Sequence, residues 1–221
     1  MGSLKTYMQK THNSTKRNYV ERMINDKVKC MIEAKKYSKN YWDGNRKYGY
    51  GGYQFIENYW KPLAKKLIRD YKLNNESNVL DIGCGKGYLI YEIKKILPNI
   101  NIVGIDISKY ALKYSHPEIK KLLSIFDARK KLKFKNNYFD LTVSLATFHN
   151  FKLNELEIAI TEVSRISKNS YIMVESYKDE EQLFNLQCWA LTANTFMDYK
   201  EWIYLFKKLN YQGDYEFIYF Q

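Results

Sequence analysis

The feature that most constrains the fold is a glycine-rich segment between a short apolar run and a helix. Val79-Leu80-Asp81-Ile82 predicts a buried strand, and Gly83-Cys84-Gly85-Lys86-Gly87 follows it directly. A helix is predicted from Gly87 to Leu97. Glycines in such a turn permit positive φ angles and a close approach of the backbone to a ligand. In an open α/β sheet, ligands bind at the carboxyl ends of strands, which is where this turn is expected to lie.

The chain after Asn78 alternates short apolar runs with helical stretches. A short helix is predicted after Ser108 and a longer one over residues 154–166. Further strands are predicted at Ile102–Asp106, Leu122–Phe126, Phe139–Leu145 and Tyr171–Val174. Such alternation is typical of an α/β fold with a doubly wound, mostly parallel sheet and helices on both faces. The C-terminal part predicts a strand near Trp189–Thr195, a helix near Tyr199–Leu209 and a last strand near Tyr215–Phe220, in unassigned order.

The first 75 residues have a different texture. From Lys16 to Tyr37, apolar residues recur at steps of three and four, which predicts one amphipathic helix. A second helix is predicted from about Ile56 to Tyr71. Between them, residues 41–53 combine aromatic residues with glycines, a composition that suits neither helix nor strand. We expect a single domain in which an N-terminal helical and lid segment (1–75) packs on an α/β core (76–221).

Composition narrows the class of protein. Hydrophobic residues make up 45% of the 221 residues, enough to fill a core, and no apolar run approaches the roughly 18–20 residues that a membrane span needs. The start of the chain lacks the apolar centre of a secretory signal. Cys30, Cys84 and Cys188 lie far apart and form no C-x-x-C pair, so a disulfide framework or zinc knuckle is not expected. These features predict a cytoplasmic protein without a membrane partner or a bound metal.

The chain carries a net charge of +12, from 36 Lys and Arg against 24 Asp and Glu. Such an excess can attract nucleic acid or another anionic partner. The basic residues are scattered, however, and Lys, Asn, Tyr and Ile are all abundant, which a compositional bias also explains. A nucleic-acid partner therefore stays open but is not favoured, and the sequence does not set an oligomeric state.

Asp106 strengthens the case for a ligand at the glycine turn. It ends the next strand, 23 residues after Gly83, where a carboxylate can accept both hydroxyls of a ribose. A dinucleotide fingerprint would place its third glycine at position 88, which Tyr88 occupies. S-adenosylmethionine (SAM) has no phosphate and needs an acceptor for its ammonium group, and Asp81 is placed to help supply one.

Three motifs resemble those of class I SAM-dependent methyltransferases, over roughly residues 78–176. Residues 81–87 resemble their motif I, Ile105-Asp106-Ile107-Ser108 resembles the acidic motif that follows, and residues 139–144 resemble their fourth-strand motif. The resemblance implies a Rossmann-like fold with SAM as cofactor. It implies a ribose contact for Asp106, adenine contacts for Asp127 and Ala128, and a place near the sulfonium for Leu145. The predicted cofactor-binding residues are Asp81, Gly83, Cys84, Gly85, Asp106, Ile107, Asp127, Ala128 and Leu145.

Two further segments resemble a bacterial subgroup of small, uncharacterised methyltransferases. These segments are residues 41–53 and Leu191-Thr192-Ala193. Members of that subgroup often accompany genes for surface polysaccharides or other small-molecule pathways, so the resemblance implies an acceptor of that kind.

Two residues are candidates for the base that takes a proton from the acceptor. His149 follows the fourth strand, and Glu175 ends the fifth, so both are expected at the carboxyl edge of the sheet. A positioned base contributes typically about 10²–10⁴-fold. A structural histidine and a solvated strand end are the plainer alternatives. The chain has no Asp-Asn pair after the fourth strand to hold magnesium, and no Asn-Pro-Pro-aromatic motif of amino-methylating enzymes.

The aromatic and glycine-rich segment is predicted to be a lid. Tyr48, Tyr50 and Tyr53 could face the sulfonium or the acceptor, because aromatic faces favour cations; a well-packed ordinary loop is the alternative. Altogether the sequence predicts a metal-independent SAM-dependent methyltransferase that methylates a small molecule, most simply an oxygen of a sugar, capsule-pathway or phosphorylated intermediate. An RNA or protein methyltransferase, and a SAM-binding module without catalysis, remain alternatives.

Overall fold

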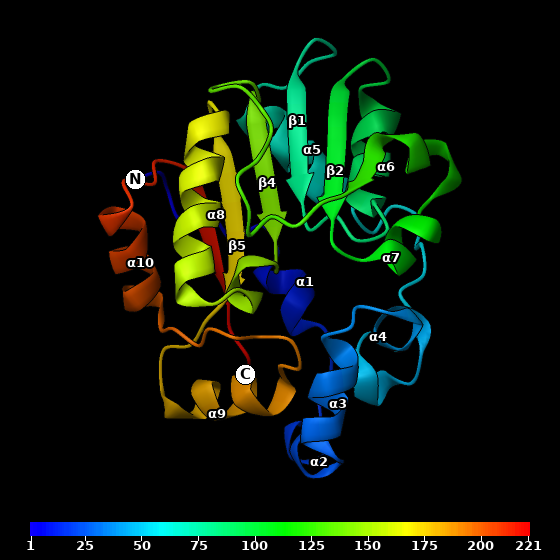
Figure 1. The fold of residues 1–221 in the computed structure, drawn as a ribbon, viewed down its shortest axis with the longest axis vertical. Helices are drawn as coiled ribbons and strands as arrows, with labels where there is room; N and C mark the ends of the chain where they lie inside the picture. The colour runs from blue at the N-terminus through cyan, green and yellow to red at the C-terminus, as the bar shows by residue number, and fades with distance from the viewer.

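A six-stranded sheet in which every neighbouring pair is parallel organises the computed structural model, which describes residues 1–221 (Figure 1). The strands are β1 Asn78–Ile82, β2 Asn101–Asp106, β3 Leu123–Ile125, β4 Leu141–Leu145, β5 Ser170–Glu175 and β6 Asp214–Ile218. Their order is β3-β2-β1-β4-β5-β6, so the direction of winding reverses between β1 and β4. Ligands bind at such a switch point in open α/β sheets. The predicted doubly wound α/β fold is confirmed.

Helices cover both faces of this sheet, and the strand residues alternate between two cores. One core contains Leu80 and Ile172 and is closed by α8 Leu153–Ile166 and α10 Tyr199–Lys208. The other contains the preceding residues of the same strands, Val79 and Tyr171, and is closed mainly by α5 Lys61–Asp70 and α6 Tyr88–Ile96. Burial on both faces explains why these strands read as continuous apolar runs.

Short helices from the N-terminal part lie over the carboxyl edge of the sheet, below the tips of the strand arrows in Figure 1. They are α1 Gln9–Asn13, α2 Tyr19–Ile24, α3 Lys27–Ala34, α4 Lys39–Asp43 and the 3₁₀ turn η1 Arg46–Tyr48. Residues 9–60 are called the cap below. The residues before the cap run beside β6, where the Lys5 N–H donates to the Tyr215 carbonyl at 2.8 Å.

The structure corrects the predicted single helix over residues 16–37. The chain forms α2 and α3 instead, because Asp26 adopts the left-handed conformation, with φ of 50°. The apolar positions that suggested one continuous stripe are largely exposed: Val20 by 57%, Ile24 by 76%, Val28 by 71% and Ile32 by 61%. The apolar residues of this segment do recur at helical spacing, but they do not form the buried face of a helix.

The predicted strand near Trp189–Thr195 is wrong. Helix α9 spans Glu180–Trp189, and the residues after it form an irregular stretch. The N–H groups of Asn194 and Thr195 donate to the carbonyl of His149, each at 3.1 Å, so this backbone is satisfied without joining a sheet. The other predictions for the C-terminal part are confirmed, because α10 and β6 fall where a helix and a last strand were expected.

The remaining elements are short connections. These are α7 Lys109–Lys113, η2 Pro117–Leu122 and η3 Phe148–Asn150. Ser108 caps α7, as its Oγ accepts from the N–H of Ala111 at 3.0 Å. None of the helices combines the length and the apolarity that crossing a membrane requires.

Candidate functional site

Two adjoining cavities open at the carboxyl edge of the sheet, between the core and the cap. Their volumes are about 310 Å³ and 440 Å³. Seven residues border both: Tyr41, Trp42, Tyr50, Gly83, Leu145, Ala146 and Thr192. The site is therefore one hollow with two compartments, built partly by strand ends and partly by the cap.

All nine residues predicted to bind the cofactor border this hollow. The smaller cavity is lined by Gly83, Asp106, Ile107, Asp127, Ala128 and Leu145. The larger cavity is lined by Asp81, Gly83, Cys84, Gly85 and Leu145. Residues that are up to 64 positions apart in the sequence thus come together because β1, β2 and β4 end at the same edge.

The backbone of the glycine turn fixes the carboxylate of Asp106. The N–H of Gly85 donates to its Oδ2 at 2.8 Å, and the N–H of Ser108 donates to its Oδ1 at 2.7 Å. Burial raises the pKa of Asp106, while these N–H donors act in the opposite direction. A carboxylate has about four acceptor positions, so two remain for a ligand such as the hydroxyls of a ribose.

Asp81 presents a second buried carboxyl group to the larger cavity. Burial first, and then the charge of Asp106, raise the pKa of Asp81 to about 7. An opposite charge close to such a group restores its ionised form. The ammonium group of SAM carries that charge, so the chemistry of this side chain fits the predicted cofactor.

Trp42 of the cap lies directly on the glycine turn. A Cβ built on Gly85 would come within 2.8 Å of the Trp42 ring, so only glycine allows this contact. The indole N–H of Trp42 donates to Ser108 Oγ at 2.9 Å, and its ring stacks on Tyr50 with centroids 5.3 Å apart. The aromatic segment therefore packs against the predicted cofactor loop.

A buried ion pair fastens the same segment to the core. Lys86 Nζ lies 2.7 Å from Oδ2 and 2.8 Å from Oδ1 of Asp43, and it also donates to the Tyr53 carbonyl at 2.7 Å. The Lys86 side chain is 3% exposed and that of Asp43 is 15% exposed. The hydroxyl of Tyr110 donates to the same carboxylate at 3.0 Å. The sequence did not indicate this pairing, because the two residues lie 43 positions apart.

The three tyrosines predicted for the lid have different places. Tyr50 and Tyr53 line the larger cavity, whereas Tyr48 packs beside Cys30 and Leu191 and lines neither cavity. Close packing explains one glycine of this segment, because a Cβ on Gly49 would lie 2.1 Å from the Tyr41 carbonyl. Whether the segment moves as a lid stays a prediction.

Glu175 and His149 form a pair in which only the carboxylate faces the larger cavity. Nδ1 of His149 accepts from the Glu175 N–H at 3.1 Å, and Nε2 lies 3.4 Å from Glu175 Oε2. His149 is 3% exposed and lines neither cavity. Burial lowers the pKa of His149, with Glu175 acting in the opposite direction. With Nδ1 as acceptor, the ring proton lies on Nε2 and points at Glu175. Of the two predicted bases, Glu175 therefore borders the larger cavity and His149 lies behind it, and which of them acts as the base stays a prediction.

Comparison with known proteins places this geometry in a family. A family model described as a methyltransferase domain matches residues 73–213. The chain belongs to this methyltransferase family. The solved structure of a SAM-dependent methyltransferase from Archaeoglobus fulgidus superposes with a TM-score of 0.52 at 21% identity, over 68% of each chain. The fold is accordingly that of the class I SAM-dependent methyltransferases, whose cofactor is SAM. The implied bacterial subgroup stays a prediction.

Two curated relatives share part of the sequence. The mitochondrial arginine-hydroxylase NDUFAF5 of Mus musculus is 30% identical over 129 residues, 58% of this chain. Malonyl-[acyl-carrier protein] O-methyltransferase of Bacillus anthracis is 28% identical over 114 residues, 49% of this chain. The matches cover only 35% and 41% of those two proteins, respectively. Their names describe different reactions, so the likeness does not decide the chemistry of this chain.

Proposed function

We propose that this chain transfers the methyl group of SAM to an oxygen of a small molecule held in the larger cavity. The observation that carries the proposal is the shared wall between the two cavities, with the predicted adenosine residues on one side and a carboxylate, Glu175, on the other. A cavity of about 440 Å³ lies within the range of small-molecule sites. Leu145, expected near the sulfonium, borders both compartments.

Residues of the smaller cavity, together with Asp81 from the larger one, would hold the cofactor. Asp106 would accept the ribose hydroxyls, Asp127 and Ala128 would lie beside the adenine, and Asp81 would face the ammonium group. When bound, SAM supplies a methyl group on a positively charged sulfur, which is already activated for transfer. The protein's own contribution is then to align the acceptor, which supplies on the order of 7–11 kcal/mol of barrier reduction in well-oriented reactions.

Glu175 would take the proton from the acceptor hydroxyl. It is the carboxylate that reaches the larger cavity from β5, and His149 behind it holds its orientation through Nε2. We assign His149 a positioning role. This assignment differs from the expectation that His149 itself contacts the acceptor.

The size of the cavity, about 440 Å³, supports a small acceptor, such as a sugar, capsule-pathway or phosphorylated intermediate handled in the cytoplasm. The likeness to the Bacillus anthracis relative, an O-methyltransferase, supports transfer to oxygen. The rival proposals are an RNA or protein acceptor, which the net charge of +12 favours, and a SAM-binding module without catalysis.

Binding and transfer can be tested in sequence. Isothermal titration with SAM, and separately with NAD, should show micromolar affinity for SAM that disappears in Asp106→Ala. Label from methyl-labelled SAM should then reach pools of sugars, sugar phosphates or nucleotide sugars rather than RNA or protein. With an acceptor in hand, Glu175→Gln should lower kcat by about 10²–10⁴-fold and leave the Kd for SAM unchanged. Absence of SAM binding would overturn the proposal, and transfer to RNA or protein would replace the acceptor class.

A further inference from the structure

Three arginines of the cap gather around one tryptophan at the larger cavity. The guanidinium carbons of Arg17, Arg22 and Arg46 lie 5.4, 4.4 and 5.1 Å from the ring centroid of Trp189. All four residues line the larger cavity. Arg17 and Arg22 are half-buried, and Arg46 is more exposed. Three positive charges therefore share one small region of the cavity wall.

None of these three charges is neutralised by an ion pair. The chain has six arginines, and the other three, Arg69, Arg129 and Arg165, each pair with a carboxylate at 2.6–2.8 Å. No carboxylate lies within 4.0 Å of the three cavity arginines. The arginines that lack a carboxylate partner are thus the ones that face the cavity.

Main-chain carbonyls hold these side chains without cancelling their charge. Arg22 donates to the carbonyls of Arg46 and Trp189, at 2.7 and 3.1 Å. Arg46 donates to the carbonyls of Gly49 and Tyr50, at 3.0 and 2.8 Å. Such contacts hold the planar guanidinium groups of both arginines in position before a ligand binds.

Arg17 offers a donor that the protein leaves unused. Its other nitrogens bond the carbonyls of His12 and Thr15, but its Nε is buried and has no partner. Burial lowers the pKa of all three cavity arginines, for Arg22 to about 10. A buried N–H without a partner costs free energy, and a positive charge without a nearby anion adds to that cost.

The other charges at this cavity do not complete the cluster. Glu175 is beyond ion-pair distance of all three arginines and instead lies 3.4 Å from Nε2 of the buried His149. His12 adds no negative charge, and burial together with Arg17 lowers its pKa to about 3, so its ring is neutral. The acidic groups that line this cavity are Glu175 and Asp81, so the three arginines outnumber them and the wall keeps an excess of positive charge.

We propose that Arg17, Arg22 and Arg46 bind an anionic group of the acceptor, a phosphate or a carboxylate, so that the substrate of the proposed methyl transfer is an anion. The inference rests on the proposed function and names its acceptor class. Guanidinium groups bind both anions through paired N–H donors. All three arginines lie outside residues 73–213, so the family core does not supply this recognition.

The test uses the full chain saturated with S-adenosylhomocysteine, titrated calorimetrically with inorganic phosphate and, separately, with malonate. Binding of one probe should weaken about tenfold or more in Arg17→Gln, Arg22→Gln and Arg46→Gln. The matched control is Arg69→Gln on α5, which should bind as the wild type does. The probe that binds more tightly identifies phosphate or carboxylate as the preferred group. Arg22→Lys serves as a second variant in case Arg22→Gln folds poorly. It keeps the positive charge but loses the paired N–H donors of the guanidinium, so it should retain part of the affinity for the probe.

SAM itself carries a carboxylate, so its Kd is measured for every variant. We expect that Kd to stay within about twofold, because the cluster serves the acceptor. A parallel loss of SAM affinity would assign the arginines to the cofactor and overturn the inference. Normal SAM binding with no arginine-dependent binding of either probe would also overturn it, while leaving the proposed function intact. Failure of the wild type to bind SAM would instead count against the proposed function.

Discussion

The core and the cap are held together by different forces. The core strands are buried on both faces and joined by a parallel hydrogen-bond ladder, with side chains such as Leu80 and Val79 fully inaccessible. In the cap, α1 and α2 contain no buried residue. The cap has only small apolar clusters, around Cys30 and around Trp42, and depends largely on specific contacts such as the Lys86–Asp43 ion pair. Hydrophobic burial stabilises the core, and a few specific contacts attach the cap to it.

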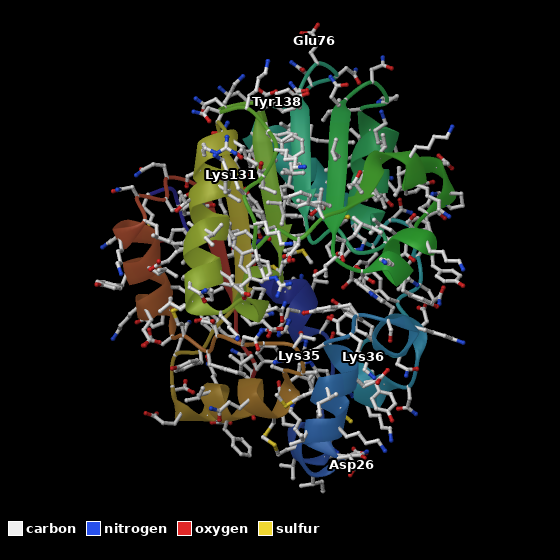
Figure 2. All side chains as sticks on the ribbon, viewed as in Figure 1. Asp26, Lys35, Lys36, Glu76, Lys131 and Tyr138 are labelled. Carbon is white, nitrogen blue, oxygen red and sulfur yellow. The ribbon has the colours of Figure 1, made fainter.

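This difference divides the site. The core brings the predicted cofactor residues together, whereas the cap contributes the arginines and much of the aromatic wall of the larger cavity. Lys35 and Lys36, labelled in Figure 2, lie where the cap meets the core and line the smaller cavity. We infer that the core fixes the donor and the cap selects the acceptor. The predictions below would break or sharpen that division.

Loss of Asp106 should have the largest effect. Asp106→Ala removes a charged acceptor, and hydrogen bonds to charged groups are each worth about 1.5–3 kcal/mol. With two ribose hydroxyls affected, SAM affinity measured by calorimetry should fall at least about 100-fold. The control is Glu76→Ala, an exposed residue at the opposite end of the sheet in Figure 2, which should bind normally. Affinity within threefold of the wild type in Asp106→Ala would show that the core does not fix the donor.

Separating Lys86 from Asp43 should detach the cap without dismantling the core. Lys86→Met leaves the Asp43 carboxylate enclosed and unpaired, which costs about 3–5 kcal/mol for a buried pair. Limited proteolysis should then cut within residues 9–60 first, and urea unfolding should show the loss.

The double variant Lys86→Met/Asp43→Leu is the matched control for this prediction. It removes both charges, so it should recover most of the stability. Equal proteolysis of the wild type and Lys86→Met would mean that this pair does not fasten the cap.

The same division decides what could be predicted from the sequence. The strands of the core and the place of Asp106 followed from local patterns: an apolar run, a glycine turn and a carboxylate at the next strand end. Parallel strands end at one edge, so these local patterns also fixed which residues meet. The motifs alone therefore selected nine residues that all border the hollow, and their contact with the cofactor stays a prediction.

The cap resisted prediction because its structure depends on contacts between distant residues. Nothing local distinguishes Val28, which is 71% exposed, from an apolar residue in a core. The ion pair of Asp43 and the gathering of arginines at Trp189 join segments up to 172 positions apart. The sequence placed His149 on the loop after β4. It could not show that Glu175, rather than His149, would border the larger cavity.

The titration of Asp81 should make SAM binding depend on pH. Its pKa, raised from 3.8 to about 7 by burial and then by Asp106, favours the neutral form in the free protein. Contact with the SAM ammonium requires the ionised form of Asp81. Below pH 7, SAM binding must therefore remove a proton from this side chain. Affinity should fall by up to about tenfold from pH 7 to pH 6 and level off above pH 8.

The stability of the free protein should have the opposite sign. A carboxyl whose folded pKa is raised binds more protons in the folded state, so this group's contribution to stability declines as pH rises from about 4 to 7. The proton that leaves Asp81 on SAM binding can be detected by calorimetric titrations with SAM in buffers of different ionisation enthalpy.

Asp81→Asn should remove the pH dependence of SAM affinity. An affinity for SAM that does not change with pH in the wild type would exclude Asp81 as the ammonium partner.

The smallest expected effects compare one left-handed residue in each region. Ala146, in the wall between the two cavities, has φ of 53°, and Asp26 in the cap has φ of 50°. A left-handed alanine costs about 1–2 kcal/mol, whereas aspartate visits this conformation more readily. Ala146→Gly should therefore stabilise the chain by about 1 kcal/mol, and Asp26→Gly by less than about 0.5 kcal/mol.

Thermal unfolding resolves this difference, since about 1 kcal/mol shifts the Tm of a domain of this size by roughly 2–4 °C. The larger shift should come from Ala146, because its strain is held by a packed core. Asp26 lies at the tip of the cap in Figure 2, where the chain between α2 and α3 can relax. A larger gain from Asp26→Gly would mean that the cap stores more strain than the core, and that the two regions are more alike than their burial suggests.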